Sequence, residues 1–391
     1  MPAPPSNKTV LVSGYCDPKF QAVKDAFTEN LQSRNEIGAS VSIVHKGKTI
    51  VDLWGGYKDS ERLHPWEENT LVCVMSVSKA IASIAVLSLV DKKIIDIEAP
   101  VAKYWPEFAQ GGKENITVRC MLAQLAGIPV VDAAPENSLY DYGVIEHGLE
   151  IQKPLWPAGS TPCYHSFTHG PLCQQLVYKT TGKSLNTYLK EDVFAPLGLG
   201  IEFHLGLSEE DIARCADITV EDGVPSIMKM GDPDTLLSRA WRPMPKDGNF
   251  FQDKRFRTFE FASGNGHSNA RSLAKLYGTL AMDCAHEKHA PNQPRALSKA
   301  CLEDAIQEQW NGVEVMTHRH FRFGTGFMLN NPYFRIGNNA RSFGHPGLGG
   351  ANSFADPDSE IGFGYCGNRV HAIDETGPCA IALIDALYKS L

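Results

Sequence analysis

Residues 71–90 have the sequence LVCVMSVSKAIASIAVLSLV. An apolar run ends at Met75, the tetrad Ser76-Val77-Ser78-Lys79 follows, and small and apolar residues then continue to Val90. This pattern predicts a buried helix with Ser76 in its first turn. At that position the backbone N–H groups and the helix dipole favour a developing negative charge.

Ser76 and Lys79 are three residues apart, so on a helix they lie on the same side. A lysine that is shielded from water loses its proton more readily and can act as a base. The pair therefore predicts an activated serine nucleophile. The alternative is an ordinary serine at a helix start, because Ser-x-x-Lys is a short pattern that recurs at 226–229 and 272–275. Only the tetrad at Ser76 has an apolar run before it and an apolar helix after it.

The composition is that of a globular protein: 391 residues, of which 43% are hydrophobic and 21% charged. The net charge of −8 argues against nucleic acid and anionic membranes as partners. The first residues lack the features of a secretory signal, and no apolar run approaches the roughly 18 residues of a membrane span. We therefore expect a cytoplasmic protein that acts on a small molecule; the sequence does not indicate its oligomeric state.

The ten cysteines and thirteen histidines are scattered, without Cys-x-x-Cys or His-Glu-x-x-His spacing. We favour buried free thiols in a reducing compartment over disulfides. The histidines likewise form no recognisable set of metal ligands. We expect neither a metal site nor an organic cofactor.

Helical and strand patterns place strands at both ends of the chain. Besides the Ser76 segment, helices are predicted at 17–34, 169–181, 268–282 and 379–391. Strands are predicted at 39–45, 49–53, 321–329, 353–356 and 361–366. The Gly-x-Gly-x-x-Gly pattern at 362–367 is better explained by the last of these strands than by a dinucleotide site, because no clear helix start follows it.

This order predicts an α/β fold of the α+β sandwich type. One antiparallel sheet is built from both chain ends and flanked by the terminal helices, and a mainly helical region is inserted between them. We expect the sheet domain at 1–72 and 263–391, the helical domain at 73–262, and the active site at their interface. The aromatic residues within 241–261 either line an acyl pocket or fill space under a long loop.

Segments along nearly the whole chain resemble those of the serine β-lactamase-like superfamily, in the same order. They are SVSK (76–79), YWPEF (104–108), ITVR (116–119), LAGI (125–128), WPAG (156–159) leading to YHS (164–166), PLGL (196–199), and FGHPG (343–347) leading to FADP (354–357). The chain is most similar to the family VIII carboxylesterases, which are related to class C β-lactamases. Each segment is short, but the joint order is specific. The resemblance implies a β-lactamase/transpeptidase-like fold with Ser76 as the nucleophile.

The resemblance also assigns roles to residues outside the tetrad. Tyr164 matches the tyrosine of the family's Tyr-x-Asn motif, whereas Ser166 stands in the substrate-binding position of the asparagine. The segment His345-Pro346-Gly347 replaces Lys-Thr-Gly, and the loss of the lysine shifts the expected substrate towards neutral esters. Gly347 would let the strand pass close to the acyl group, and the N–H of Leu348 would join that of Ser76 in an oxyanion hole.

One further departure from the family is Gln124, which stands where a histidine is common. We expect it to be a structural hydrogen-bonding group.

The expected function is a serine carboxylesterase that cleaves small to medium neutral esters through an acyl-enzyme on Ser76. Lys79 and Tyr164 would share the role of base, and the sequence leaves open which of them takes the proton. An acyltransferase would use the same acyl-enzyme with an alcohol or amine in place of water. β-Lactamase or D-aminopeptidase activity fits less well, because the Lys-Thr-Gly motif and an export signal are missing. A non-catalytic scaffold fits least, because all three catalytic residue types are present.

Overall fold

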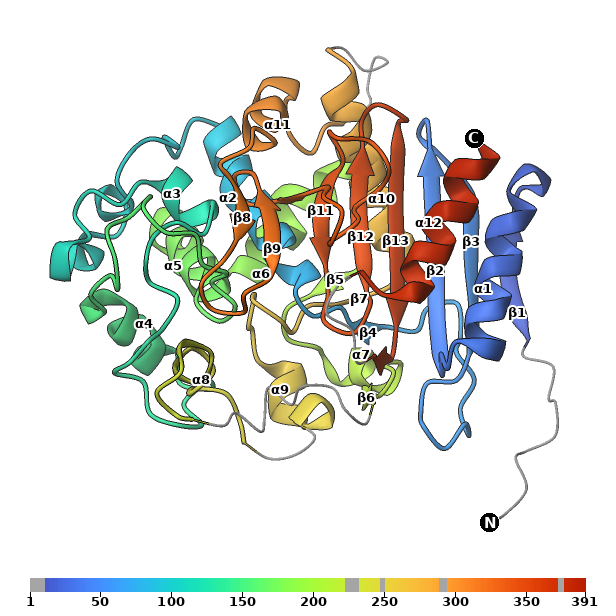
Figure 1. The fold of residues 1–391 in the computed structure, drawn as a ribbon, viewed down its shortest axis with the longest axis horizontal. Helices are drawn as coiled ribbons and strands as arrows, with labels where there is room; N and C mark the ends of the chain where they lie inside the picture. The colour runs from blue at the N-terminus through green and yellow to red at the C-terminus, as the bar shows by residue number, and fades with distance from the viewer. Residues whose placement is uncertain (1–10, 222–231, 247–249, 288–293, 372–375) are drawn as a thin grey trace.

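A nine-stranded antiparallel sheet forms the centre of the molecule (Figure 1). The structure is a computed structural model that describes residues 11–221, 232–246, 250–287, 294–371 and 376–391. The strand order is β1-β3-β2-β13-β12-β11-β10-β9-β8. These strands are β1 Val12–Cys16, β2 Gly38–His45, β3 Lys48–Gly56, β8 Trp310–Val313, β9 His320–Phe323, β10 Met328–Leu329, β11 Phe343–Pro346, β12 Asn352–Asp356 and β13 Ile361–Gly367. The first and last parts of the chain meet where β2 pairs with β13.

The described parts of the chain contain twelve α-helices. They are α1 Gln21–Ser33, α2 Val77–Asp91, α3 Val118–Leu122, α4 Tyr142–Ile151, α5 His169–Thr181, α6 Leu185–Tyr188, α7 Glu209–Ala213, α8 Leu236–Ala240, α9 Lys254–Thr258, α10 Ala270–Ala285, α11 Lys299–Ala305 and α12 Pro378–Ser390. Two small sheets complete the fold: β4 Val72–Cys73 and β5 Phe203–His204 both pair with β7 His267–Ser268, and β6 Thr219–Val220 pairs with β14 Arg369–Val370.

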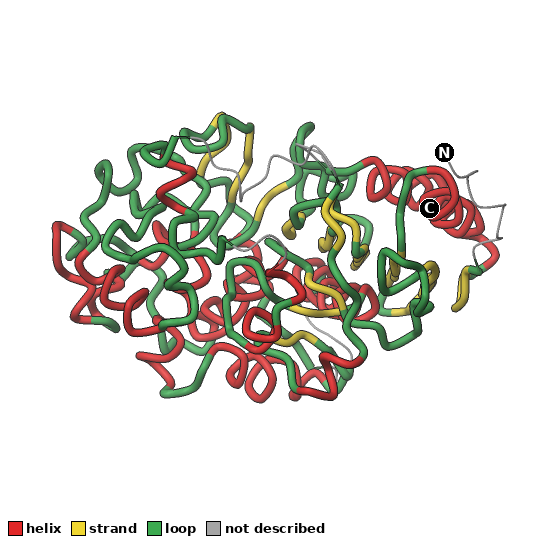
Figure 2. The backbone as a smooth tube through the Cα atoms, turned by 90° about the horizontal axis from the view of Figure 1, so that it is seen from below, coloured by secondary structure: helices red, strands yellow, loops and turns green. Residues whose placement is uncertain are grey.

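The two terminal helices, α1 and α12, pack against each other on one face of the sheet (Figure 1). The pattern in α1 explains this, because Val23, Phe27 and Leu31 lie on one side of the helix and are buried. They join a core that also contains the inward side chains of β2, β3 and β13. Seen at 90° to the first view, the terminal helices lie at one end of the molecule and most of the other helices at the opposite end (Figure 2).

Helix α10 covers the other face of the sheet and lies very close to β13. Glycines make this approach possible: a Cβ on Gly362 would lie 2.0 Å from the backbone nitrogen of Gly278 in α10. The glycine pattern at 362–367 therefore serves strand-to-helix packing. Helix α2, buried along almost its whole length, belongs to the same core and contacts β11 and α5.

The expected fold class is confirmed, and so are most of the predicted elements. Helix α5 has the predicted bounds, β2 and β13 differ from them by one residue at one end, and α12 differs by one residue at each end. The helix predicted at 17–34 is a 3-10 turn, Pro18–Phe20, followed by α1. The single strand predicted at 321–329 is wrong: the chain forms β9 and β10, and a turn containing Gly324 and Gly326 separates them. Two edge strands, β1 and β8, were not predicted.

Within the described residues, no helix is both long and apolar enough to cross a membrane.

Candidate active site

Ser76 lies at a tight turn between β4 and α2. The preceding residue, Met75, has a φ of +51°, a conformation that costs free energy for a residue with a side chain. Ser78 holds this turn, because its hydroxyl donates to Met75 O at 2.6 Å and accepts from Gly266 N at 2.9 Å. The Ser76 hydroxyl makes no capping bond to the helix that it precedes. The turn thus presents Ser76 at the N-terminus of a 15-residue helix with its hydroxyl available for chemistry.

Lys79 lies one helical turn after Ser76 and is almost completely buried, with 1% of its surface exposed. Its Nζ is 3.2 Å from Ser76 Oγ and 2.6 Å from the carbonyl oxygen of Ser263. Burial lowers the pKa of Lys79 to about 7. A substantial fraction of the side chain is therefore a neutral amine at neutral pH, in hydrogen-bond reach of the serine hydroxyl.

Tyr164, on the segment between α4 and α5, lies beside Lys79. The Lys79 ammonium lies 5.0 Å from the centre of its ring, and the ring stacks on Phe321 of β9 at 5.3 Å. Burial raises the pKa of the Tyr164 phenol, against a hydrogen bond to Ser76 and the charge of Arg319, which lower it. The phenol is therefore protonated at neutral pH and is placed to donate a proton near Ser76.

Glu314 is a buried carboxylate that sequence reasoning missed. It lies directly after β8, and its Oε2 accepts from the backbone N–H groups of Tyr164 and Met316, each at 3.0 Å. Its other oxygen accepts from the N–H and the hydroxyl of Thr317. The carboxylate thereby anchors the Tyr164 segment to the loop between β8 and β9. No motif marks it, because the Tyr164 N–H that it holds is 150 residues away in the chain.

The residues that flank Tyr164 are structural. His165 N donates to Gln124 Oε1 at 2.7 Å, which is the hydrogen-bonding role expected of Gln124. Burial lowers the pKa of His165 to about 4, and its ring bonds Cys163 O and Ile128 N. Ser166 is buried, and among the described residues its hydroxyl has no hydrogen-bond partner. The structure thus places Ser166 next to Tyr164 but shows no bond from it to the other candidate residues.

The end of β11 approaches the turn before Ser76. A Cβ on Gly347 would lie 2.5 Å from Val74 O and 3.3 Å from the Cβ of Met75, so only glycine fits there. The next residue, Leu348, lines a pocket together with Met75. Neither the Ser76 nor the Leu348 backbone N–H has a hydrogen-bond acceptor within the described part of the chain. Two free donors therefore lie on the two segments that meet beside Ser76.

His345 does not replace the positive charge of the missing lysine. Burial and the nearby Lys79 lower the pKa of His345 to about 3, so its imidazole is neutral at neutral pH. Its Nδ1 bonds Pro346 O at 2.7 Å, and its ring centre lies 6.0 Å from that of Tyr164. The His345 ring packs against the rings of Tyr164 and Phe323, and its Nε2 has no hydrogen-bond partner among the described residues.

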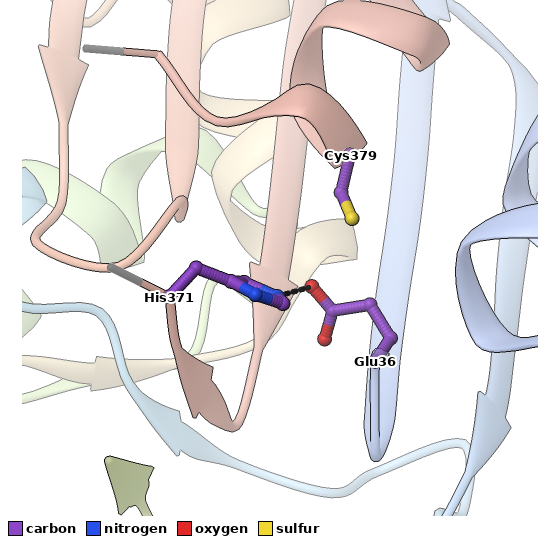
Figure 3. Close-up of side chains that lie close together, drawn as sticks. All are labelled: Glu36, His371 and Cys379. Carbon is purple, nitrogen blue, oxygen red and sulfur yellow. Dashed lines mark hydrogen bonds and ion pairs between the residues drawn. The ribbon is translucent and has the colours of Figure 1, made fainter. Parts of the chain in front are cut away.

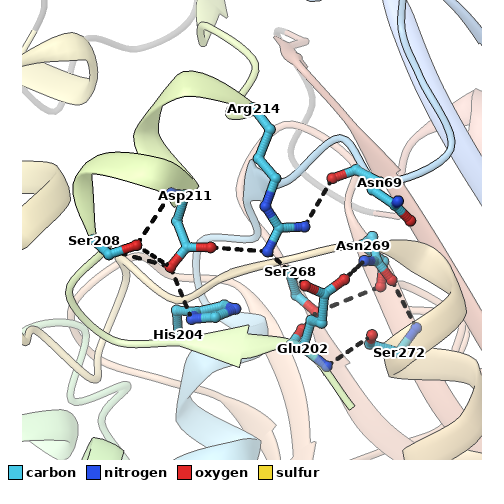
Figure 4. Close-up of polar contacts among 9 residues, drawn as sticks. All are labelled: Asn69, Glu202, His204, Ser208, Asp211, Arg214, Ser268, Asn269 and Ser272. Carbon is cyan, nitrogen blue, oxygen red and sulfur yellow. Dashed lines mark hydrogen bonds and ion pairs between the residues drawn. The ribbon is translucent and has the colours of Figure 1, made fainter. Parts of the chain in front are cut away.

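A polar network braces the segment that leads into β4 (Figure 4). Arg214 donates to Asn69 O at 3.0 Å and pairs with Glu202 and Asp211. Glu202 also bonds Asn269, the N-cap of α10. The network connects the segment before Ser76 to helix α10, which packs on the sheet.

Of the other two Ser-x-x-Lys tetrads, the one at 272–275 lies within the described residues and forms no such site. The tetrad at 226–229 lies outside the described residues. In the tetrad at 272–275, Ser272 Oγ accepts from Glu202 N, while Lys275 Nζ donates to Leu199 O. These two side chains bond different partners, so for this tetrad the structure agrees with the sequence context that favoured Ser76.

Comparisons with known proteins point to one family. A family model described as Beta-lactamase matches residues 23–387. The chain is 29% identical to Esterase/beta-lactamase LipL of Mycobacterium tuberculosis, over 92% of this chain and 83% of that protein. The crystal structure of a family VIII carboxylesterase matches with 32% identity and a TM-score of 0.88, over 97% of this chain and 100% of that one. A penicillin-binding protein homologue from Caulobacter crescentus matches with 31% identity, the same TM-score and the same coverage.

Proposed function

The chain belongs to the beta-lactamase family, and we propose that it is a serine carboxylesterase that hydrolyses small to medium neutral esters. The observation that carries the proposal is the contact of 3.2 Å between Lys79 Nζ and Ser76 Oγ, with the pKa of Lys79 at about 7. Matches to an esterase and to a family VIII carboxylesterase over most of the chain support the same reaction class.

We infer that Lys79 is the base in the first step. The neutral amine takes the Ser76 proton as Oγ bonds the ester carbonyl carbon, and the carbonyl oxygen becomes an oxyanion. Tyr164 is not this base, because its pKa is raised and its phenol is protonated. The N–H groups of Ser76 and Leu348 are the donors proposed for the oxyanion, and the N-terminus of α2 adds its dipole.

Tyr164 is the proposed acid for the leaving alcohol. As the intermediate collapses, the phenol protonates the departing alkoxide, the ester C–O bond breaks, and the Lys79 ammonium returns a proton to the phenolate. The acyl group remains on Ser76 Oγ. Water then attacks the acyl-enzyme and loses a proton to the same pair of groups, which restores the Ser76 hydroxyl and releases the acid.

Because His345 is neutral, we expect an ester substrate that carries no charged group where it faces this residue. A lysine there would offer a fixed charge to a carboxylate, whereas the imidazole is neutral and bonded to Pro346 O. Gly347 and Ser166 are proposed to line the acyl site, because one touches the turn before Ser76 and the other follows Tyr164 with an unpartnered hydroxyl.

We also propose a cytoplasmic location. All ten cysteines are free thiols, and seven of them are buried. This arrangement suits a reducing compartment.

The proposal is tested with p-nitrophenyl esters of increasing acyl length, alongside nitrocefin as a β-lactam. We expect ester turnover that Ser76→Ala lowers at least about 10³-fold, and little turnover of nitrocefin. Ester hydrolysis that survives Ser76→Ala would overturn the proposal. Adding an alcohol to the assay separates hydrolysis from acyl transfer through the ratio of free acid to new ester.

A further inference from the structure

Three potential metal ligands, none of them among the candidate active-site residues, lie close together (Figure 3). Glu36 precedes β2, His371 follows β14, and Cys379 lies in the first turn of α12. Their ligand atoms all lie within 4.8 Å of one another. All three residues are buried, with 2%, 7% and 1% of their surfaces exposed.

Only one of the two oxygens of the Glu36 carboxylate has hydrogen-bond partners in the described part of the chain. Its Oε1 accepts from Tyr365 Oη at 2.7 Å and from His371 Nε2 at 2.9 Å. Its Oε2 has no hydrogen-bond partner within the described part of the chain, although it is buried. A buried carboxylate oxygen without a partner is costly, and coordination of a cation is one way to satisfy it.

The groups around these three side chains have the arrangement found behind metal ligands. His371 Nδ1 lies 3.6 Å from Glu221 Oε2, so a carboxylate faces the ring nitrogen opposite Glu36. Metal-binding histidines commonly donate their second N–H to a carboxylate, which fixes the ring and its tautomer. Tyr365 similarly bonds the Glu36 carboxylate and holds it in place.

We propose that Glu36, His371 and Cys379 form a Zn²⁺ site. Carboxylate, imidazole and thiolate are the three ligand types that zinc takes in proteins, and a carboxylate with a thiolate balances its two charges. Metal binding displaces the thiol proton of Cys379 to solvent. Because the ligand is the thiolate, we expect tighter Zn²⁺ binding at higher pH.

A metal at this site would brace the loop that carries Leu348. The backbone N–H of His371 donates to Gly349 O at 3.4 Å, and a Cβ on Gly349 would meet Val370 Cα at 2.5 Å. Glu36, Tyr365 and Leu348 also line one pocket. The ester chemistry proposed for Ser76 needs no metal, so the zinc would act on stability and loop position, and the two proposals stand or fall separately.

The test uses the full-length protein stripped with a chelator and then titrated with Zn²⁺ or Co²⁺. We expect one tightly bound Zn²⁺ per chain by elemental analysis, a higher Tm, and, with Co²⁺, the near-ultraviolet charge-transfer band that a thiolate ligand produces. Cys379→Ser should abolish the band. Cys301→Ser is the matched control and should keep it, because the Cys301 thiol bonds Leu87 O in another part of the core.

Two further variants keep the test decisive if Cys379→Ser fails to fold. Glu221→Gln should weaken Zn²⁺ binding by about 10- to 100-fold, and His371→Gln should weaken it more. Absence of bound metal in the wild type, or a Co²⁺ spectrum without the thiolate band, would overturn the proposal. The cluster would then be a hydrogen-bonded brace only.

Discussion

At the scale of single residues, the site depends on a lysine that the fold keeps away from water. Burial lowers the pKa of Lys79 to about 7, and its shorter hydrogen bond, 2.6 Å, is to a neutral carbonyl, Ser263 O. A carboxylate in that position would hold the ammonium charged and remove the base. The Ser-x-x-Lys spacing predicted the pairing of Ser76 with Lys79, whereas the burial that makes the amine reactive depends on segments more than 180 residues away.

The first prediction concerns the pH dependence of ester hydrolysis. Only the neutral amine accepts the Ser76 proton, so kcat/KM should rise with pH through about 7 and level off above it. Below that pH it should fall by about tenfold per unit. Steady-state kinetics between pH 5 and 9 measure this.

Lys79→Met should abolish the activity, and Lys275→Met is the matched control. Lys275 belongs to another Ser-x-x-Lys tetrad and bonds Leu199 O, so its loss should leave the profile unchanged. A wild-type profile that is flat from pH 6 to 8 would contradict the assignment of Lys79 as base.

At the scale of elements, the loop between β8 and β9 positions the proposed acid through Glu314. Glu314→Gln keeps the shape of the side chain but weakens its bonds to the Tyr164 and Met316 amides. We expect kcat to fall on the order of tenfold while KM changes little, because the phenol is displaced from the leaving group.

Glu308→Gln is the control, because Glu308 pairs with Arg322 beside the same hairpin without reaching Tyr164. Equal kinetic effects of the two substitutions would show that Glu314 has no special role in positioning.

The contact between α10 and β13 gives a prediction on stability. Gly362→Ala places a methyl group 2.0 Å from Gly278 N, so the helix must move away from the sheet. We expect a loss of about 1–3 kcal/mol in the free energy of unfolding, measured with urea. Gly312→Ala in β8 is the control, since a Cβ there meets nothing within 4 Å. A wild-type unfolding midpoint for Gly362→Ala would contradict this account of the packing.

The elements with long, regular apolar patterns were predictable and the short ones were not. The sequences of helix α5 and of strands β2 and β13 have apolar residues at the positions that are buried, so their patterns are visible without the rest of the fold. Strands β1 (VSGYC) and β8 (WNGV) lie at the two edges of the sheet, and each contains partly buried and exposed residues without a clear apolar pattern. Only their hydrogen bonds to the neighbouring strand identify them as strands. The break between β9 and β10 follows from Gly326, whose φ of +87° ends the strand.

At the scale of the whole molecule, the sheet built from both chain ends was predictable because strand patterns occur only at those ends. The resemblance placed Tyr164, His345 and Gly347 near Ser76, and the structure brings all of them together. The division into domains at 72/73 and 262/263 stays a prediction. The cluster of Glu36, His371 and Cys379 was not predictable, because its members have no local spacing and are more than 330 residues apart at the extremes.

Because four histidines are buried in the folded protein, we expect its free energy of unfolding to decrease in acid. Burial lowers the pKa of His165 to about 4 and those of His267 and His345 to about 3, and that of His169 falls well below its usual value. These folded-state pKa values lie below the unfolded value of about 6.5. The stability that these histidines contribute is therefore complete above pH 6.5 and is lost as pH falls towards 3.

One buried carboxylate acts in the opposite direction. Burial raises the pKa of Asp283 to about 7, so near pH 5 it holds a proton that the unfolded chain releases, which offsets one of the four histidine protons. Because the four histidine protons outnumber this one, we expect the free energy of unfolding to fall as pH is lowered from 7.5 to 5. Urea unfolding at pH 7.5, 6 and 5 measures the slope, and equal stability at pH 7.5 and 5 would contradict it.

The central claim is that Ser76 is the nucleophile and forms the acyl-enzyme. Intact-protein mass spectrometry after treatment with a fluorophosphonate, followed by peptide mapping, tests it most directly. The account predicts one adduct per chain on Ser76, slower labelling of Lys79→Met, and none of Ser76→Ala. An adduct on any other residue, or undiminished labelling of Ser76→Ala, would contradict it.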